Sequence, residues 1–162
     1  MSTVTVTQHV AAPAAQVWGL LSDIAGRRAW LSTAGAVTLL TPPPFGAGTV
    51  WQETHAMPDG TQVTEEYHVA RCVPGRCFVL TSPGRGAAYR TTYTLTPVTS
   101  GRHRGETLVT VTLDGYAEGR SARLLEFLLG GVAVRTAEGA LRQELVNLAH
   151  AATTPGGDTP AA

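Results

Sequence analysis

The sequence predicts an α+β fold in which a curved antiparallel sheet of about seven strands wraps around a long C-terminal helix. Strand-like runs follow one another along the chain, separated by Pro, Asp and Gly, as in strands joined by hairpins. Two short helical stretches come after the first run, and the chain ends in a long segment of helical period. A sheet with one apolar face needs a cover, and only this last segment is long enough to provide it.

The first strand and the two short helices are predicted near the N-terminus. Thr and Val alternate over 3–10, which indicates a half-buried strand. Pro13 then suits the first turn of a helix, and Asp23 can cap a second helix that ends near Trp30. Both helices are too short to be stable alone, so they must pack on the rest of the fold.

Six further strands are predicted before the chain changes period. Turn residues such as "MPDG" and "VPG" separate them, which favours hairpin connections between neighbours. The six runs cover residues 36–41, 48–56, 61–72, 76–82, 87–98 and 106–117.

The final helix is predicted within 121–152, which contains no proline. Gly130 and Gly131 interrupt this stretch, and they indicate a kink, a close backbone contact or a boundary between two helices. We expect one domain over 1–152 and a disordered tail over 153–162. The apolar residues that recur at roughly helical spacing are Leu124, Leu128, Val134, Leu141, Leu145 and Leu148.

The charge balance argues against several classes of function. Twelve basic and twelve acidic residues cancel in a chain of 162 residues, so no basic surface for nucleic acid or an anionic membrane is expected. No signal peptide and no stretch of about 20 apolar residues is present, so we expect no membrane insertion and a cytoplasmic location.

Several segments in collinear order resemble the START-like superfamily (SRPBCC), in its polyketide cyclase/dehydrase-like branch. They are "VAAPAAQVWGLLSDIAGRRAW", "GAGTVWQET", "YTLTPV", "ETLVTVTLDG" and "GALRQELVNL". The resemblance implies a helix-grip fold with an internal cavity, and it carries over no catalytic residue. Because the superfamily includes both enzymes and ligand carriers, it does not decide the activity.

The sequence is compatible with two functions and with a third class of protein. We expect the cavity to bind a small hydrophobic molecule, either aromatic and polyketide-like or lipid-like. The alternative is a cyclase or dehydratase. An interaction module would follow if Val63, Tyr67 and Val69 were exposed, and a homodimer is left open. We expect no cofactor.

The orientation of the segment "GTVWQETHA" decides whether the cavity has polar chemistry. Trp51, Glu53 and His55 share one face of this strand, and burial of the indole favours that face pointing inward. A four-residue "MPDG" loop would place Glu53 opposite Thr64, and it would bring Glu66 onto the same face. In this register two carboxyl groups lie within reach of each other in an apolar cavity.

The candidate site residues follow from this orientation. Glu53 and Glu66 are the candidate general acid and base of an enzyme, with His55 beside them. His55 and His68 would lie roughly 20 Å apart along the ladder, too far for one metal, so no metal site is expected there. We assign no functional role to His9, His103 or His150. The candidate ligand-binding residues are Trp30, Trp51, Glu53, His55, His68, Tyr89 and Tyr93.

Overall fold

The computed structural model describes residues 2–56, 59–83, 87–117 and 131–154. Its elements follow the predicted order of one strand, two short helices, six strands and a long helix. They are β1 (Ser2–Val10), α1 (Ala14–Ser22), α2 (Arg27–Trp30), β2 (Ala34–Leu39), β3 (Val50–Ala56), β4 (Gln62–Val73), β5 (Cys77–Pro83), β6 (Ala87–Pro97), β7 (Thr107–Ala117) and α4 (Gly131–Thr153).

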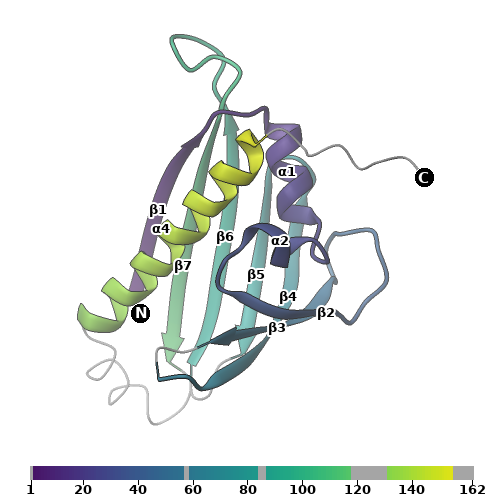
Figure 1. Ribbon diagram of the computed structural model, residues 1–162, viewed down its shortest axis with the longest axis vertical. Helices are drawn as coiled ribbons and strands as arrows, with labels where there is room; N and C mark the ends of the chain where they lie inside the picture. The colour runs from purple at the N-terminus through teal and green to yellow at the C-terminus, as the bar shows by residue number, and fades with distance from the viewer. Residues whose placement is uncertain (1, 57–58, 84–86, 118–130, 155–162) are drawn as a thin grey trace.

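The seven strands form one antiparallel sheet in the order β1-β7-β6-β5-β4-β3-β2. Strands β2 to β6 are each paired with the next strand in sequence, and β1 joins the sheet beside β7. The long helix α4 lies across the inner face of the sheet, over β1 and its neighbours, while α1 and α2 lie beside it (Figure 1). The predicted helix-grip architecture is therefore confirmed.

The core fills the space between the inner face of the sheet and the helices. Alternation along each strand sends one set of side chains to this face, and the described part of α4 adds leucines at helical spacing. The buried residues that form it include Val4, Val6, Val10, Val17, Leu21, Trp51, Val69, Phe78, Leu80, Tyr93, Leu95, Val109, Val111, Leu141, Leu145 and Leu148.

The outer face of the sheet is rich in threonine and is wetted. Cross-strand hydroxyl pairs join neighbouring strands there, with Thr5 and Thr112 oxygens 3.2 Å apart and Thr54 and Thr64 oxygens 3.1 Å apart. Such pairs suit positions that face water on a β-sheet. The outer face thus contains few apolar side chains, and the apolar residues are concentrated on the inner face.

The register of the β3–β4 hairpin differs by one residue from the expected one. Ala56 pairs with Gln62, so five residues rather than four separate the paired ends, and Glu53 lies opposite Glu65 instead of Thr64. A shift of one residue moves every side chain of a strand to the other face. The expectation that Glu66 shares the face of Glu53 is therefore wrong, because Glu66 lies opposite Gln52 on the outer face.

The β4–β5 hairpin combines two irregularities that cancel. Val73 pairs with Cys77 across a three-residue loop, and a bulge follows between Val69 and Arg71. Each irregularity alone would move the side chains of β5 to the other face of the sheet. The two together leave Leu80 opposite Val69, on the inner face. With Val69 buried, Tyr67 packed on the core and only Val63 exposed, the condition for an interaction module is not met.

The helices are connected to one another by side-chain hydrogen bonds. Gln16 of α1 donates from Nε2 to the carbonyl oxygen of Ala152 at 2.7 Å. Asn147 of α4 donates from Nδ2 to the hydroxyl of Ser32, which follows α2, at 2.8 Å.

Residues 118–130 and 155–162 lie outside the described ranges, and with them the predicted first part of the final helix and most of the predicted tail. Within the described ranges, no helix is sufficiently long and apolar to span a bilayer.

Candidate functional site

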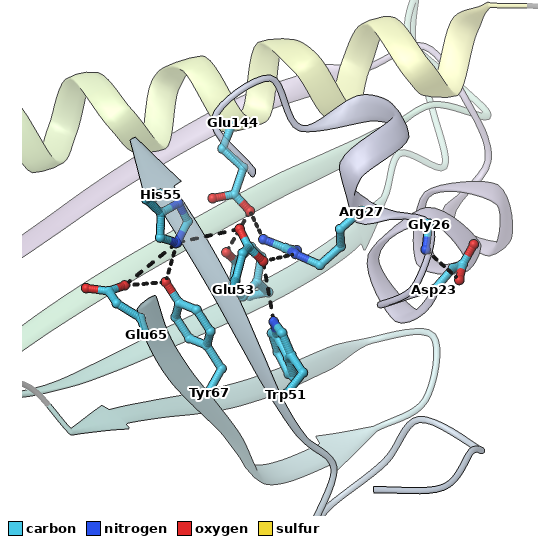
Figure 2. Close-up of polar contacts among 10 residues, drawn as sticks. Asp23, Gly26, Arg27, Trp51, Glu53, His55, Glu65, Tyr67 and Glu144 are labelled. Atoms are coloured by element: carbon cyan, nitrogen blue, oxygen red, sulfur yellow. Dashed lines mark hydrogen bonds and ion pairs between the residues drawn. The ribbon is translucent and has the colours of Figure 1, made fainter. Parts of the chain in front are cut away.

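A buried arginine lies at the centre of the polar cluster beneath α4. Arg27 is the first residue of α2, and the turn before it is held by a hydrogen bond from the backbone N–H of Gly26 to the carboxylate of Asp23 at 3.1 Å (Figure 2). The side chain of Arg27 is only 7% exposed. The short helix therefore directs a cation into the interior rather than to solvent.

Two carboxylates from different elements face this guanidinium. Nε of Arg27 donates to Oε2 of Glu53 on β3 at 2.9 Å, and Nη2 lies 3.6 Å from Oε1 of Glu144 on α4. The hydroxyl of Tyr93 on β6 donates to the same Glu144 oxygen at 2.8 Å. The cluster links α2, β3, β6 and α4 (Figure 2). The orientation of α4 therefore depends on the ion pairs between Arg27 and the two glutamates.

The charges determine the protonation of the two buried partners of Glu144. Burial alone would lower the pKa of Arg27, but the carboxylates of Glu144 and Glu53 raise it above its ordinary value, so the guanidinium is always charged. Burial, reinforced by Glu144, raises the pKa of the Tyr93 hydroxyl, which therefore remains a hydrogen-bond donor. The interior thus holds one cation beside two acidic side chains.

A second group of polar side chains extends from Glu53 along the hairpin. Nε2 of His55 lies 3.6 Å from Oε1 of Glu53 and 3.1 Å from the hydroxyl oxygen of Tyr67. The hydroxyl of Tyr67 donates its proton to Glu65, so His55 must be the donor to Tyr67, and its Nε2 carries a proton. Burial, with the Glu65 carboxylate beside it, raises the pKa of Tyr67.

Two buried polar atoms at this site make no hydrogen bond within the described residues: Nε1 of Trp30 and Oε1 of Glu53. The first is a donor and the second an acceptor. Both side chains touch Arg27, whose guanidinium carbon lies 5.5 Å from the centre of the Trp30 ring. Buried polar groups nearly always make a hydrogen bond, so a donor and an acceptor without one around a single arginine are unusual.

Aromatic side chains pack around this polar cluster. Trp51 stacks on Tyr67 with ring centres 5.3 Å apart, and it donates from Nε1 to Oε2 of Glu53 at 3.4 Å. Phe78 stacks on Tyr93 at 4.6 Å. Aromatic surface with a few fixed polar groups is typical of sites for small hydrophobic molecules.

The structure brings together five of the residues that the sequence singled out. Trp51 and Glu53 are fully buried, as the orientation argument predicted, and Tyr93 joins them through Glu144. Trp30 and His55 contact the same cluster.

The other predicted residues lie elsewhere. Glu66 and His68 form a partly exposed pair on the outer face, with Oε1 and Nε2 2.7 Å apart. Hydrogen bonds from His68 and Gln52 lower the pKa of Glu66. His68 and Tyr89 line a separate surface pocket of about 310 Å³, together with Thr81, Ser82, Ala88, Arg90 and Tyr116.

Arg27, Glu144, Tyr67 and Glu65 are site residues that sequence reasoning missed. Glu144 shares a helical face with Leu141, Leu145 and Leu148, and an acid among buried leucines was a usable signal. Arg27 offered a weaker one, because a four-residue helix has no recognisable face. Tyr67 and Glu65 were missed because of the one-residue error in register.

Comparison with known proteins assigns the chain to a family. A family described as "Polyketide cyclase / dehydrase and lipid transport" matches residues 1–153. The chain belongs to this family. No curated protein matches the chain.

Solved structures show the same fold at low sequence identity. A START superfamily protein from Mycobacterium smegmatis is 16% identical with a TM-score of 0.72, and the match covers 93% of this chain and 96% of that one. A protein from Chromobacterium violaceum is 16% identical with a TM-score of 0.70, covering 96% and 100%. The di-domain ARO/CYC BexL from the BE-7585A biosynthetic pathway is 19% identical with a TM-score of 0.69, covering 95% of this chain and 50% of that one.

Proposed function

We propose that this family member binds a small hydrophobic molecule between the sheet and α4, and that a hydroxyl group of the ligand is recognised by Glu53 and Trp30. The ligand class is an aromatic, polyketide-like or lipid-like alcohol or phenol. The observation that carries the proposal is that two buried atoms beside Arg27, Oε1 of Glu53 and Nε1 of Trp30, make no hydrogen bond within the described residues.

A hydroxyl fits this pair because it both donates and accepts. It donates to the Glu53 oxygen and accepts from the Trp30 indole, and both groups are then satisfied. The rings of Trp51 and Tyr67 supply apolar contact for the rest of the molecule. Arg27 holds the other oxygen of Glu53 at 2.9 Å, which fixes the acceptor in place.

The experiment compares two probes that differ by one hydroxyl. A naphthol and naphthalene are titrated into the protein while tryptophan fluorescence is recorded. We expect naphthol to bind more tightly than naphthalene, and the Glu53→Gln variant to weaken naphthol binding by about tenfold or more. A hydrogen bond to a charged group contributes about 1.5–3 kcal/mol, which corresponds to that factor.

Glu66→Gln is the matched control. It removes a carboxylate one strand away on the outer face, and binding of both probes should be unchanged. Equal affinity for naphthol and naphthalene would contradict recognition of a hydroxyl. Absence of binding by either probe would contradict the ligand site altogether.

A cyclase or dehydratase is the second candidate, and one contact favours it. Nε2 of His55 lies 3.6 Å from Oε1 of Glu53, so an imidazole and a carboxylate lie next to each other. The pair can take a proton from a carbon beside a carbonyl group and return it to oxygen, as cyclisation and dehydration both require. In this site His55 takes the place that the sequence assigned to Glu66.

Proton exchange tests this candidate without knowledge of the substrate. An aromatic ketone such as tetralone is incubated with the protein in D₂O, and the α-proton signal is followed by NMR. An enzyme of this kind accelerates its loss, and the acceleration disappears in Glu53→Gln and in His55→Ala but persists in Glu66→Gln. If the wild-type protein produces no acceleration although naphthol binds, the chain is a binding protein and not a proton-transfer enzyme.

A further inference from the structure

Two histidines and a glutamate from separate segments meet at one end of the sheet. His9 is the penultimate residue of β1, His103 lies in the loop between β6 and β7, and Glu106 directly precedes β7. Nδ1 of His103 lies 2.9 Å from Oε2 of Glu106, and Nδ1 of His9 lies 3.7 Å from the same oxygen. The candidate ligand atoms of all three residues lie within 4.8 Å of one another.

The β6–β7 loop holds its two members of the cluster in place. The backbone N–H of Glu106 donates to the carbonyl oxygen of His103 at 3.0 Å. Val98 and Glu106 are joined at the base of the loop by a hydrogen bond of 2.9 Å, and Gly105 donates to Val98 at 2.9 Å. Gly105 has φ of +89°, a conformation that glycine adopts without strain. The loop therefore presents His103 and Glu106 on a defined backbone.

We propose that His9, His103 and Glu106 form a binding site for a divalent transition metal, with Zn²⁺ as the reference ion. Zinc binds imidazole nitrogen and carboxylate oxygen at about 2.0–2.2 Å, so two ligand atoms of a tetrahedral site are about 3.4 Å apart. The observed separations of 2.9 and 3.7 Å bracket that distance. The three side chains can close around an ion with small rotations.

The ligand set favours this class of metal over the alkaline earths. Mg²⁺ and Ca²⁺ take oxygen ligands almost entirely, whereas two imidazoles and one carboxylate suit zinc, copper and nickel. Water completes the fourth position, because the histidine side chains are about half exposed. Arg102 and Arg104 are exposed in the same loop, and their charge weakens the attraction for a cation.

A bound ion would connect β1 to the loop between β6 and β7. His9 and Glu106 are separated by 97 positions in the chain, so the metal closes a long segment and stabilises the folded state relative to the unfolded one. This site shares no residue with the Arg27 cluster, so the two proposals are tested by different variants.

Isothermal titration of Zn²⁺ into tag-free, chelator-treated protein tests the proposal. We expect one ion per chain and a rise in Tm on addition of Zn²⁺, because the ion binds the folded state. His9→Ala and His103→Ala should each weaken binding at least about tenfold and remove the rise in Tm, as each loses one of three protein ligands. Both side chains are half exposed, so the metal-free variants should fold as the wild type does, which circular dichroism verifies.

His68→Ala is the matched control. His68 also pairs with a glutamate at 2.7 Å on the surface, but no second histidine joins that pair in the part of the chain that the structure describes. Its removal should leave zinc binding unchanged. The proposal is overturned if millimolar Zn²⁺ produces neither heat nor a change in Tm, or if binding survives in the double variant His9→Ala/His103→Ala.

Discussion

Arg27 places its guanidinium between two carboxylates and two indole rings, in an interior that is otherwise apolar. The guanidinium carbon lies 5.5 Å from the Trp30 ring centre and 5.9 Å from that of Trp51. Cation–π attraction adds to the ion pairs at such distances, and more so when the groups are desolvated. A single side chain therefore neutralises two acids, and it positions Glu53, the one that we assign to ligand recognition.

Replacing Arg27 by methionine should destabilise the protein strongly. The variant leaves Glu53 and Glu144 buried without their cation, and removing one partner of a buried ion pair costs about 3–5 kcal/mol. The free energy of unfolding from urea denaturation measures the loss. Arg28→Met is the matched control, since the neighbouring arginine is exposed, and it should change stability by less than about 0.5 kcal/mol. Equal effects of the two substitutions would contradict a special role for Arg27.

Two tyrosines, Tyr93 in the core and the partly buried Tyr67, predict loss of stability at alkaline pH. The pKa values of Tyr67 and Tyr93 are raised above 10.0 in the folded protein, by burial first and then by Glu65 and Glu144 respectively. Their contribution is complete below the pKa of an unfolded tyrosine and is lost as pH rises beyond it. Tyrosinate absorbance should therefore increase for these two residues only together with unfolding.

The variants Tyr67→Phe and Tyr93→Phe check this assignment. Each should reduce the part of the tyrosinate signal that coincides with the unfolding transition followed by circular dichroism. Ionisation of Tyr67 or Tyr93 while the protein stays folded would show that these hydroxyls are not held as donors.

Burial at the level of single residues was partly readable from the sequence. Trp51 had to be hidden because of its size, and Glu53 two positions away was carried inward with it. Arg27 could not be assigned in the same way, because an arginine next to a second arginine is ordinarily a solvated pair. Only the contact with Glu53, which is 26 positions away, shows why one of the two points inward.

At the scale of elements, the number and order of strands and helices followed from period and turn residues. The register did not, because it depends on loop length and on bulges that leave little trace in composition. The β3–β4 loop is longer by one residue than the four-residue turn, and that residue exchanges Glu66 for Glu65 at the site. The bulge after Val69 keeps the apolar side chains of β5 on the inner face, and so preserves the core.

A glycine in β2 is required by the close approach of β3. A Cβ built on Gly35 would lie 2.8 Å from the backbone carbonyl oxygen of Thr54, next to the irregularity between Ala34 and Val37. Gly35→Ala should therefore lower the free energy of unfolding by about 1–3 kcal/mol, as overpacking does. Thermal denaturation measures the change.

Gly139 supplies the opposite case in α4. A Cβ there meets nothing within 4 Å, so Gly139→Ala adds a better helix former without a clash. The substitution should raise the free energy of unfolding by about 1 kcal/mol. Destabilisation by Gly139→Ala, or no effect of Gly35→Ala, would contradict the packing described for these elements.

At the scale of the whole molecule, α4 closes the inner face and brings Glu144 to the sheet. The seven strands alone would leave an open, apolar surface, and the helix turns that surface into an interior with a polar centre. The fold class, the helix that covers the sheet and the inward orientation of Trp51 could be inferred from the sequence alone. The convergence of α2, β3, β6 and α4 on one arginine could not, because it depends on contacts between distant parts of the chain.

The indole N–H signals of the protein offer the most direct test of the ligand site. The chain has three tryptophans, so an amide-correlation NMR spectrum contains three such signals, which substitution of each tryptophan assigns. On addition of a naphthol, the Trp30 signal should move downfield because its Nε1–H gains an acceptor, whereas the Trp18 signal should stay in place. Naphthalene should produce no downfield shift of Trp30, and Glu53→Gln should diminish the shift caused by naphthol. If the Trp30 signal is unmoved by saturating naphthol, the hydroxyl is not bound beside Arg27 and the proposed site is wrong.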